Sequence, residues 1–193
     1  MSDQIDELQL KVISCVKCGL SKSRTNAVPG KGNPKAEILF IGEAPGRNED
    51  LQGEPFVGSA GKILSEALDY AGISRDGVFI TNVVKCRPPE NRLPLVEEKD
   101  ACSEHLSKEL EIIKPKIICI LGNTAYNSLL GGDSITKNRG KIIEKNGQKY
   151  FLTIHPAAVI YNPELKDVLK NDIKALADNL RRLKKESKIT DFA

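Results

Sequence analysis

Short apolar runs alternate with longer amphipathic segments along this chain. Four runs rich in β-branched residues predict buried strands, at residues 37–41, 78–83, 116–121 and 150–154. Apolar residues recur at helical spacing in residues 59–71, 95–113 and 123–130, and again after Asn162-Pro163. Asn123 or Thr124 is the expected cap of the helix at 123–130. Strands that alternate with helices predict an α/β fold, with a mostly parallel sheet covered on both faces.

Asn146-Gly147 is a strong signal for a tight hairpin turn. It separates two strand-like segments, residues 141–144 and 148–154. The fourth main strand is therefore expected to gain a short antiparallel neighbour. No repeat, low-complexity segment or linker divides the 193 residues, which predicts a single domain over residues 1–193.

A polar or glycine-rich cluster stands at the carboxyl end of each expected main strand. In chain order these clusters are residues 42–46 (GEAPG), Thr81-Asn82, residues 122–124 (GNT) and His155-Pro156. Open parallel sheets bind their ligands beyond the carboxyl ends of the strands. The four clusters therefore predict one site at one edge of the sheet.

The composition is that of an ordinary globular protein, with 28% charged and 40% hydrophobic residues. No apolar run approaches the roughly 20 residues that a membrane span needs. The acidic, polar start of the chain does not resemble a signal peptide, so a soluble cytoplasmic (intracellular) protein without a membrane partner is expected. A net charge of +3 permits nucleic-acid binding, but any DNA contact must come from a local basic face.

The five cysteines indicate a metal site, because an odd number in an intracellular chain argues against a disulfide framework. Cys15 and Cys18 form a C-x2-C pair, whereas Cys86 and Cys102 are spaced C-x15-C. Four thiolates suit zinc or an iron–sulfur cluster, and the wide second spacing favours the cluster. Zinc and buried free thiols are the alternatives. Cys119 lies within a strand and is expected in the core.

Residues 42–50 (GEAPGRNED) and 53–61 (GEPFVGSAG) form a glycine-rich stretch that ends at the start of a helix. Backbone N–H groups in such a stretch can hold a phosphate. Neither the G-x-G-x-x-G pattern nor the G-x4-G-K-[ST] pattern of nucleotide-binding loops is present.

Taken with residues 155–163 (HPAAVIYNP), these motifs resemble the family 4 uracil-DNA glycosylases, the iron–sulfur members of their superfamily. The match includes GEAPG, GEPFVGSAGK, TNVVKC, RPPENR, HPAAV and the four cysteines in order, over residues 15–162. The resemblance implies a three-layer α/β/α sandwich with a central, mostly parallel four-stranded sheet. It also implies a [4Fe–4S] cluster on Cys15, Cys18, Cys86 and Cys102. The implied activity is monofunctional hydrolysis that releases uracil from DNA and leaves an abasic site, a step of base excision repair.

The resemblance also implies a base-binding pocket for a flipped deoxyuridine. Phe56 is expected to stack on the base, with a core phenylalanine as the alternative. Asn82 is expected to donate to uracil O4 and to accept from N3–H, a pattern that cytosine reverses; a strand-end turn asparagine is the alternative. His155 is expected to donate to O2 as negative charge builds on the departing base. The other histidine, His105, lies in a predicted helix and is expected at the surface or beside the cysteines, with no assigned role.

Glu43 is the first candidate to position the attacking water or to stabilise an oxocarbenium-like sugar. The sequence departs here from the best-known glycosylases of the superfamily. Their water-activating aspartate falls at Ala44, and their tyrosine that excludes the thymine methyl falls at Gly46. Glu49 is therefore the candidate for thymine exclusion.

DNA contacts are expected from the glycine-rich stretch and from the proline-rich loop after residue 86, with Ile160 or Tyr161 as a wedge into the gap left by the flipped base. The expected contact residues are Ser59, Arg87, Asn91 and Arg92.

The last eight residues, 186–193, resemble a sliding-clamp-binding peptide in which Ile189 and Phe192 would fill a hydrophobic pocket. The usual leading glutamine is Glu186 here, and an ordinary frayed tail is the alternative. The chain is expected to act as a monomer on uracil-containing DNA.

Two other functions stay open at this level. A non-catalytic iron–sulfur DNA-binding module with a degenerate pocket is favoured by Ala44. A zinc-containing nucleotide-binding protein is the weaker alternative.

Overall fold

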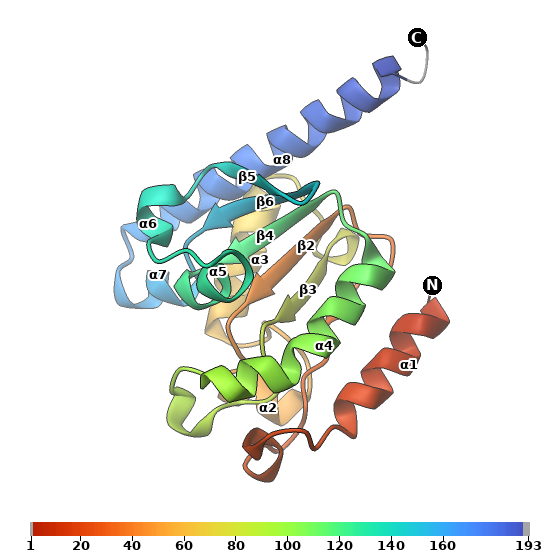
Figure 1. Cartoon of the computed structure of the whole chain (residues 1–193). Coiled ribbons are helices and arrows are strands. Elements are labelled where there is room, and N and C mark those ends of the chain that lie inside the picture. Colours follow the sequence, from red (N-terminus) through yellow and green to blue (C-terminus); the bar gives the residue numbers. More distant parts are fainter. Residues whose placement is uncertain (1, 191–193) are drawn as a thin grey trace.

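The computed structural model describes the backbone of residues 2–190 and the side chains of residues 3–186. Of the expected clamp-binding positions, Phe192 and the side chain of Ile189 lie outside these described residues. Within them, six strands form one sheet in the spatial order β1-β3-β2-β4-β6-β5 (Figure 1). None of the helices in this part of the chain is long and apolar enough to cross a membrane.

The elements follow the predicted alternation of strands and helices. The strands are β1 (Lys31–Gly32), β2 (Ile38–Gly42), β3 (Phe79–Asn82), β4 (Ile117–Leu121), β5 (Ile142–Lys145) and β6 (Gln148–Thr153). The α-helices are α1 (Ser2–Ile13), α2 (Arg47–Gln52), α3 (Ser59–Tyr70), α4 (Val96–Ile113), α5 (Asn123–Leu130), α6 (Ile135–Asn138), α7 (Ala157–Tyr161) and α8 (Leu165–Thr190). The 3-10 helices are η1 (Gly19–Lys22), η2 (Arg75–Gly77) and η3 (Pro89–Asn91).

The centre of the sheet consists of the four predicted main strands. β3, β2, β4 and β6 lie in this order and pair in parallel. The predicted hairpin is also confirmed, because β5 pairs antiparallel with β6. The sheet has six strands instead of the expected four main strands and one neighbour, because β1 pairs antiparallel with β3. A two-residue strand of Lys31 and Gly32 carries no apolar alternation by which the sequence could reveal it.

Helices cover both faces of the sheet, which confirms the three-layer α/β/α sandwich. On one face, Leu39 and Ile41 of β2 belong to an apolar cluster that includes residues of α1 and α4. On the other face, Ile38 and Phe40 of the same strand belong to a cluster with α3, α7 and α8. Figure 1 shows α4 in front of the sheet and α3 behind it. Cys119 of β4 is fully buried in this core, as expected.

The cap of α5 differs from the expectation. Gly122 occupies the cap position with a φ of 86°, a conformation that favours glycine. A β-carbon at Gly122 would lie 2.9 Å from the β-carbon of His155. Asn123 instead accepts a hydrogen bond from the Ile135 amide, and the Thr124 hydroxyl donates to Glu43. The direct passage from strand to helix leaves both side chains free for distant partners.

Candidate functional site

The carboxyl ends of the four central strands bring the polar clusters to one edge of the sheet. Gly42 at the end of β2 is in register with Asn82 at the end of β3. On the other side of β2, Leu121 of β4 is in register with Thr153 of β6, two residues before His155. The clusters thus follow one another across adjacent strands.

Phe56, Asn82 and His155 come from separate segments and meet at this edge. A β-carbon at Gly42 would lie 2.5 Å from Asn82 Oδ1 and 2.6 Å from Phe56 Cζ, so both side chains lie over Gly42. The rings of Phe56 and His155 have centroids 5.7 Å apart and planes inclined at 36°. The three side chains that were expected to contact a base therefore share one location.

The Phe56 backbone is held in an unusual conformation. Its φ of 54° lies in the left-handed region, which costs a bulky residue about 1–3 kcal/mol. The Arg75 guanidinium donates to the carbonyl oxygens of Phe56 at 2.9 Å and Pro55 at 3.2 Å. Gly61 leaves room for this turn, because a β-carbon there would lie 1.8 Å from the Phe56 carbonyl oxygen. These contacts fix the direction of the aromatic ring.

Asn82 presents an unpaired acceptor at the site. The residue is 2% exposed, and its Oδ1 has no hydrogen-bond partner among the described residues. Buried side-chain acceptors are nearly always paired in folded proteins. An unpaired one beside Phe56 is open to a hydrogen-bond donor, N–H or O–H, from a bound ligand.

His155 is a neutral hydrogen-bond donor. Desolvation lowers the pKa of His155 to about 4, although the charge of Glu49 opposes the shift. Its Nδ1 accepts from the Ala157 amide at 3.2 Å, so in the neutral ring Nε2 carries the proton. The ring can therefore donate one hydrogen bond from Nε2 at neutral pH.

Glu49 is bound to backbone amides of two loops. Its Oε1 accepts from Val57 at 3.0 Å and Gly58 at 2.7 Å, and its Oε2 accepts from Gly46 at 3.1 Å. The carboxylate thus joins the start of α2 to the loop that carries Phe56. These contacts give Glu49 a structural task that the sequence did not reveal.

Glu43 is partly buried and lies directly after β2. The hydroxyl of Thr124, at the start of α5, donates a hydrogen bond to Glu43 Oε2. This contact orients the carboxylate from the neighbouring strand end. Thr124 was expected only as a possible helix cap, and nothing in the local sequence indicates its contact with a residue 81 positions away.

The expected DNA-contact residues lie on two separate segments. Ser59 is exposed in the first turn of α3. In the loop after β3, Arg87 Nε donates to Asn91 Oδ1 at 2.8 Å. Arg92 makes a bidentate contact with Glu98, at 2.8 and 2.6 Å, so much of its hydrogen-bonding capacity is already used within the protein.

The expected wedge residues project from the short helix that follows His155. Ile160 is 50% exposed and Tyr161 is 89% exposed. Large apolar and aromatic side chains at such exposure beside a site are available for contact with a macromolecule.

The four expected metal-binding cysteines line one cavity. Cys15, Cys18, Cys86 and Cys102 come from the segment after α1, the segment after β3 and α4. Arg24 donates to Cys86 Sγ at 2.9 Å, and the Lys85 amide donates to Cys102 Sγ at 3.3 Å. Burial raises the pKa of the Cys86 thiol, and it raises the pKa of the Cys102 thiol to about 11.

His105 lines the same cavity, one helical turn after Cys102. It was expected either at the surface or beside the cysteines. The surface alternative is wrong, because the residue is 7% exposed and its Nε2 has no partner among the described residues. The helical spacing of Cys102 and His105 was the signal that could have placed it.

Comparisons with known proteins identify a family for this chain. The model of the Uracil DNA glycosylase superfamily matches residues 29–181. A type-4 uracil-DNA glycosylase of Sulfurisphaera tokodaii is 51% identical over 186 residues, which cover 91% of this chain and 84% of the relative. One of Archaeoglobus fulgidus is 45% identical, over 91% of this chain and 93% of the relative. A type-5 uracil-DNA glycosylase of Pyrobaculum aerophilum is 31% identical, over 80% of this chain and 74% of the relative.

The family model and these relatives cover the strand ends that carry Glu43, Asn82 and His155, together with the loop that carries Phe56. The fold and the matches agree, and the chain belongs to the uracil-DNA glycosylase superfamily.

Proposed function

We propose that this chain is a monofunctional uracil-DNA glycosylase, which flips deoxyuridine out of DNA, releases uracil and leaves an abasic site. The observation that carries the proposal is the meeting of Phe56, Asn82 and His155 at one edge of the sheet. The relatives named as type-4 uracil-DNA glycosylases support the same reaction.

Recognition of the base rests on Phe56 and Asn82. The fixed Phe56 ring offers a stacking surface, and base–aromatic stacking contributes roughly 1–3 kcal/mol. The unpaired Asn82 Oδ1 would accept from uracil N3–H, while its amide group donates to O4. Cytosine has no proton at N3 and would leave this buried acceptor unpaired, which is costly.

Departure of the base depends on His155. When the bond between C1′ and N1 breaks, its electron pair stays on uracil and negative charge spreads to O2. A neutral Nε2–H placed at O2 stabilises this anion by a hydrogen bond without transferring a proton.

Glu43 would act on the sugar side of the reaction. Its carboxylate, oriented by Thr124, would hold the attacking water or stabilise positive charge on the sugar. The water oxygen bonds to C1′ and its proton passes to solvent. Ala44 supplies no second carboxylate, so this task falls to Glu43.

Glu49 would exclude thymine by fixing the pocket wall. Its carboxylate holds the amides of Gly46 and Gly58 close to one another. A rigid backbone at these positions leaves no freedom to accommodate the 5-methyl group of thymine. Glu49 thus acts through the two loops that it joins.

The four cysteines suit a [4Fe–4S] cluster. They line one cavity together with His105, whose buried Nε2 has no protein partner in the described chain and could donate to a cluster sulfide. In the range that the structure describes, no three His, Cys, Asp or Glu side chains are grouped closely enough for one metal ion. The thiolates of Cys15, Cys18, Cys86 and Cys102 would hold the cluster. When bound, the cluster would cross-link the segment after α1 to α4 and to the segment after β3.

The reading role of Asn82 predicts a large loss of activity on substitution. Asn82→Ala should lower the single-turnover rate of uracil release from a deoxyuridine oligonucleotide by at least about 100-fold. Binding to DNA that carries an abasic-site analogue should persist. Asn127→Ala, at an exposed position of α5, is the matched control. A near-normal rate in the Asn82→Ala enzyme would remove the site assignment.

The neutral state of His155 predicts its titration. Its imidazole signals in NMR spectra should shift with a pKa of about 4, and the signals should vanish in a His155→Ala variant. Because the ring is neutral well above that value, the excision rate should not fall through protonation of His155 between about pH 8 and pH 6. A measured pKa near 6.5 would contradict this account.

The orientation of Glu43 predicts a role for the Thr124 hydroxyl. Thr124→Val keeps the shape of the side chain but removes the donor, and should lower kcat about tenfold. Thr124→Ser keeps the donor and should restore most of the rate. KM should change little in either variant, and equal losses in both would argue against the orienting contact.

The cluster proposal predicts yellow-brown protein with about four iron and four sulfide ions per chain. Cys102→Ser should lose the visible absorption, whereas Cys119→Ala should keep it because Cys119 lies in the core of the sheet. A colourless protein that contains one zinc ion would instead support the zinc alternative.

A further inference from the structure

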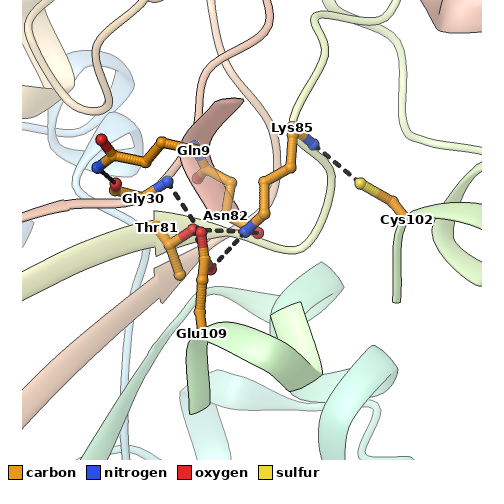
Figure 2. Close-up of polar contacts among 7 residues, drawn as sticks. All are labelled: Gln9, Gly30, Thr81, Asn82, Lys85, Cys102 and Glu109. Atoms are coloured by element: carbon orange, nitrogen blue, oxygen red, sulfur yellow. Dashed lines mark hydrogen bonds and ion pairs between the residues drawn. The ribbon is translucent and has the colours of Figure 1, made fainter. Parts of the chain in front are cut away.

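Lys85 is a fully buried lysine that lies between the cysteine cavity and the strand end that carries Asn82. Its side chain is 1% exposed, and its ammonium donates to three acceptors, as Figure 2 shows. These are Glu109 Oε2 at 2.7 Å, Thr81 Oγ1 at 2.5 Å and the carbonyl oxygen of Asn82 at 2.7 Å. An ammonium has three protons, so each of them has an acceptor.

Glu109, on α4, completes the network and is 2% exposed. Its Oε1 accepts from the Gly30 amide at 2.9 Å, and its Oε2 also accepts from the Thr81 hydroxyl at 2.8 Å. Every charge in this buried group is thus paired and hydrogen-bonded. Stability alone does not explain such a pair, because well-packed apolar residues often replace buried ion pairs at no cost.

The third acceptor of Lys85 belongs to the residue that would read the base. Asn82 is the last residue of β3, and its side chain stands over Gly42. A bond to its carbonyl fixes the peptide plane that follows, and the Val83 amide on this plane donates to the Gly42 carbonyl at 2.9 Å. With the peptide held at both atoms, the direction in which the Asn82 side chain leaves the backbone is set.

The backbone of Lys85 contacts the cysteine cavity, on the side away from Asn82. Its amide donates to Cys102 Sγ, and its neighbour in sequence is Cys86. One residue therefore contacts the cysteine cavity through its backbone and the base-reading strand end through its side chain, as Figure 2 shows.

A second ion pair, in which only the carboxylate is buried, provides a contrast. Thr153, at the end of β6, donates to Asp172 of α8 at 2.7 Å, and Arg139 pairs with that carboxylate. Besides Asp172, the Arg139 guanidinium donates to the Val168 carbonyl on α8. It has no hydrogen bond to the backbone of His155 among the described contacts. Both pairs hold a strand-end threonine, but the Lys85 pair also contacts a site residue directly.

We propose that Lys85 is a positioning residue for the base-reading amide of Asn82, which it holds through a bond from its buried ammonium to the Asn82 carbonyl. This inference rests on the proposed function, in which Asn82 reads uracil. It assigns Lys85 no contact with the substrate.

A paired substitution separates positioning from folding. Lys85→Met alone would leave the Glu109 carboxylate buried without its cation, so Lys85→Met is combined with Glu109→Gln. Glutamine can still accept from Gly30 and bond Thr81, so the variant loses the two charges and the bonds from Lys85 to the Asn82 carbonyl and the Thr81 hydroxyl. Leu176→Ala, at a fully buried position of α8, is the control for lost stability alone.

The test is a double-mutant cycle on the single-turnover rate of uracil release. In the wild-type background, Lys85→Met/Glu109→Gln should lower the rate about 10- to 100-fold. In the Asn82→Ala background, the same change should lower it less than about twofold, because the group being positioned is absent.

Hydrogen exchange of the peptide over residues 79–86 should accelerate in the Lys85→Met/Glu109→Gln variant. Its visible absorption should stay, because the Lys85 amide remains. Leu176→Ala should leave the rate unchanged, and it should accelerate exchange across the whole core of the sheet, not locally over residues 79–86.

Each result has a distinct meaning. A wild-type rate in the paired variant would overturn the role of Lys85 and leave the proposed function intact. The same holds if Asn82→Ala is itself impaired and the paired change lowers the rate equally in both backgrounds. Loss of visible absorption together with activity would also overturn it, since the effect would then pass through the cysteine site. Near-normal turnover of Asn82→Ala would overturn the proposed function of Asn82 first, and this inference with it.

Discussion

The lack of a side chain at Gly42 is the constraint on which the site depends. Gly42 ends the strand at the middle of the site, and Asn82 Oδ1 and Phe56 Cζ both lie within 2.6 Å of the place where a β-carbon would stand. Any other residue would force these two side chains apart. The Phe56 ring is kept in this space by its left-handed backbone conformation. Arg75 holds that backbone by a hydrogen bond, and Gly61 leaves room for it.

Three acidic residues near the strand ends differ in role because their partners differ. Glu49 accepts from backbone amides and joins two loops, whereas Glu109 is buried against Lys85 and supports β3. Glu43 has a hydroxyl donor and retains partial exposure, which leaves it available to water and sugar. Despite the nearby charge of Glu49, desolvation keeps the His155 ring neutral, so that it serves as a donor.

The sequence predicted the repeating elements well and the exceptions poorly. β-Branched runs located the four central strands, and Asn146-Gly147 located the hairpin, because both signals are local. β1 was missed because two residues carry no period. The cap of α5 was assigned to Asn123 or Thr124 because both are common caps, but tertiary contacts occupy their side chains. The surface alternative for His105 failed because the burial of one face of α4 depends on the packing of α1.

The order of polar clusters along the chain was sufficient to determine that one site forms beyond the strand ends. In a parallel sheet, chain direction alone sends every carboxyl end to the same edge. Which side chains work together was decided only by tertiary structure. The contacts of Thr124 with Glu43, of Glu49 with the Phe56 loop, and of Lys85 with Glu109 and Asn82 depend on strand order and on the packing of α4 and α5. Hydrogen bonds of this kind join residues that are distant in sequence or turned toward one another by a loop, and no local pattern encodes them.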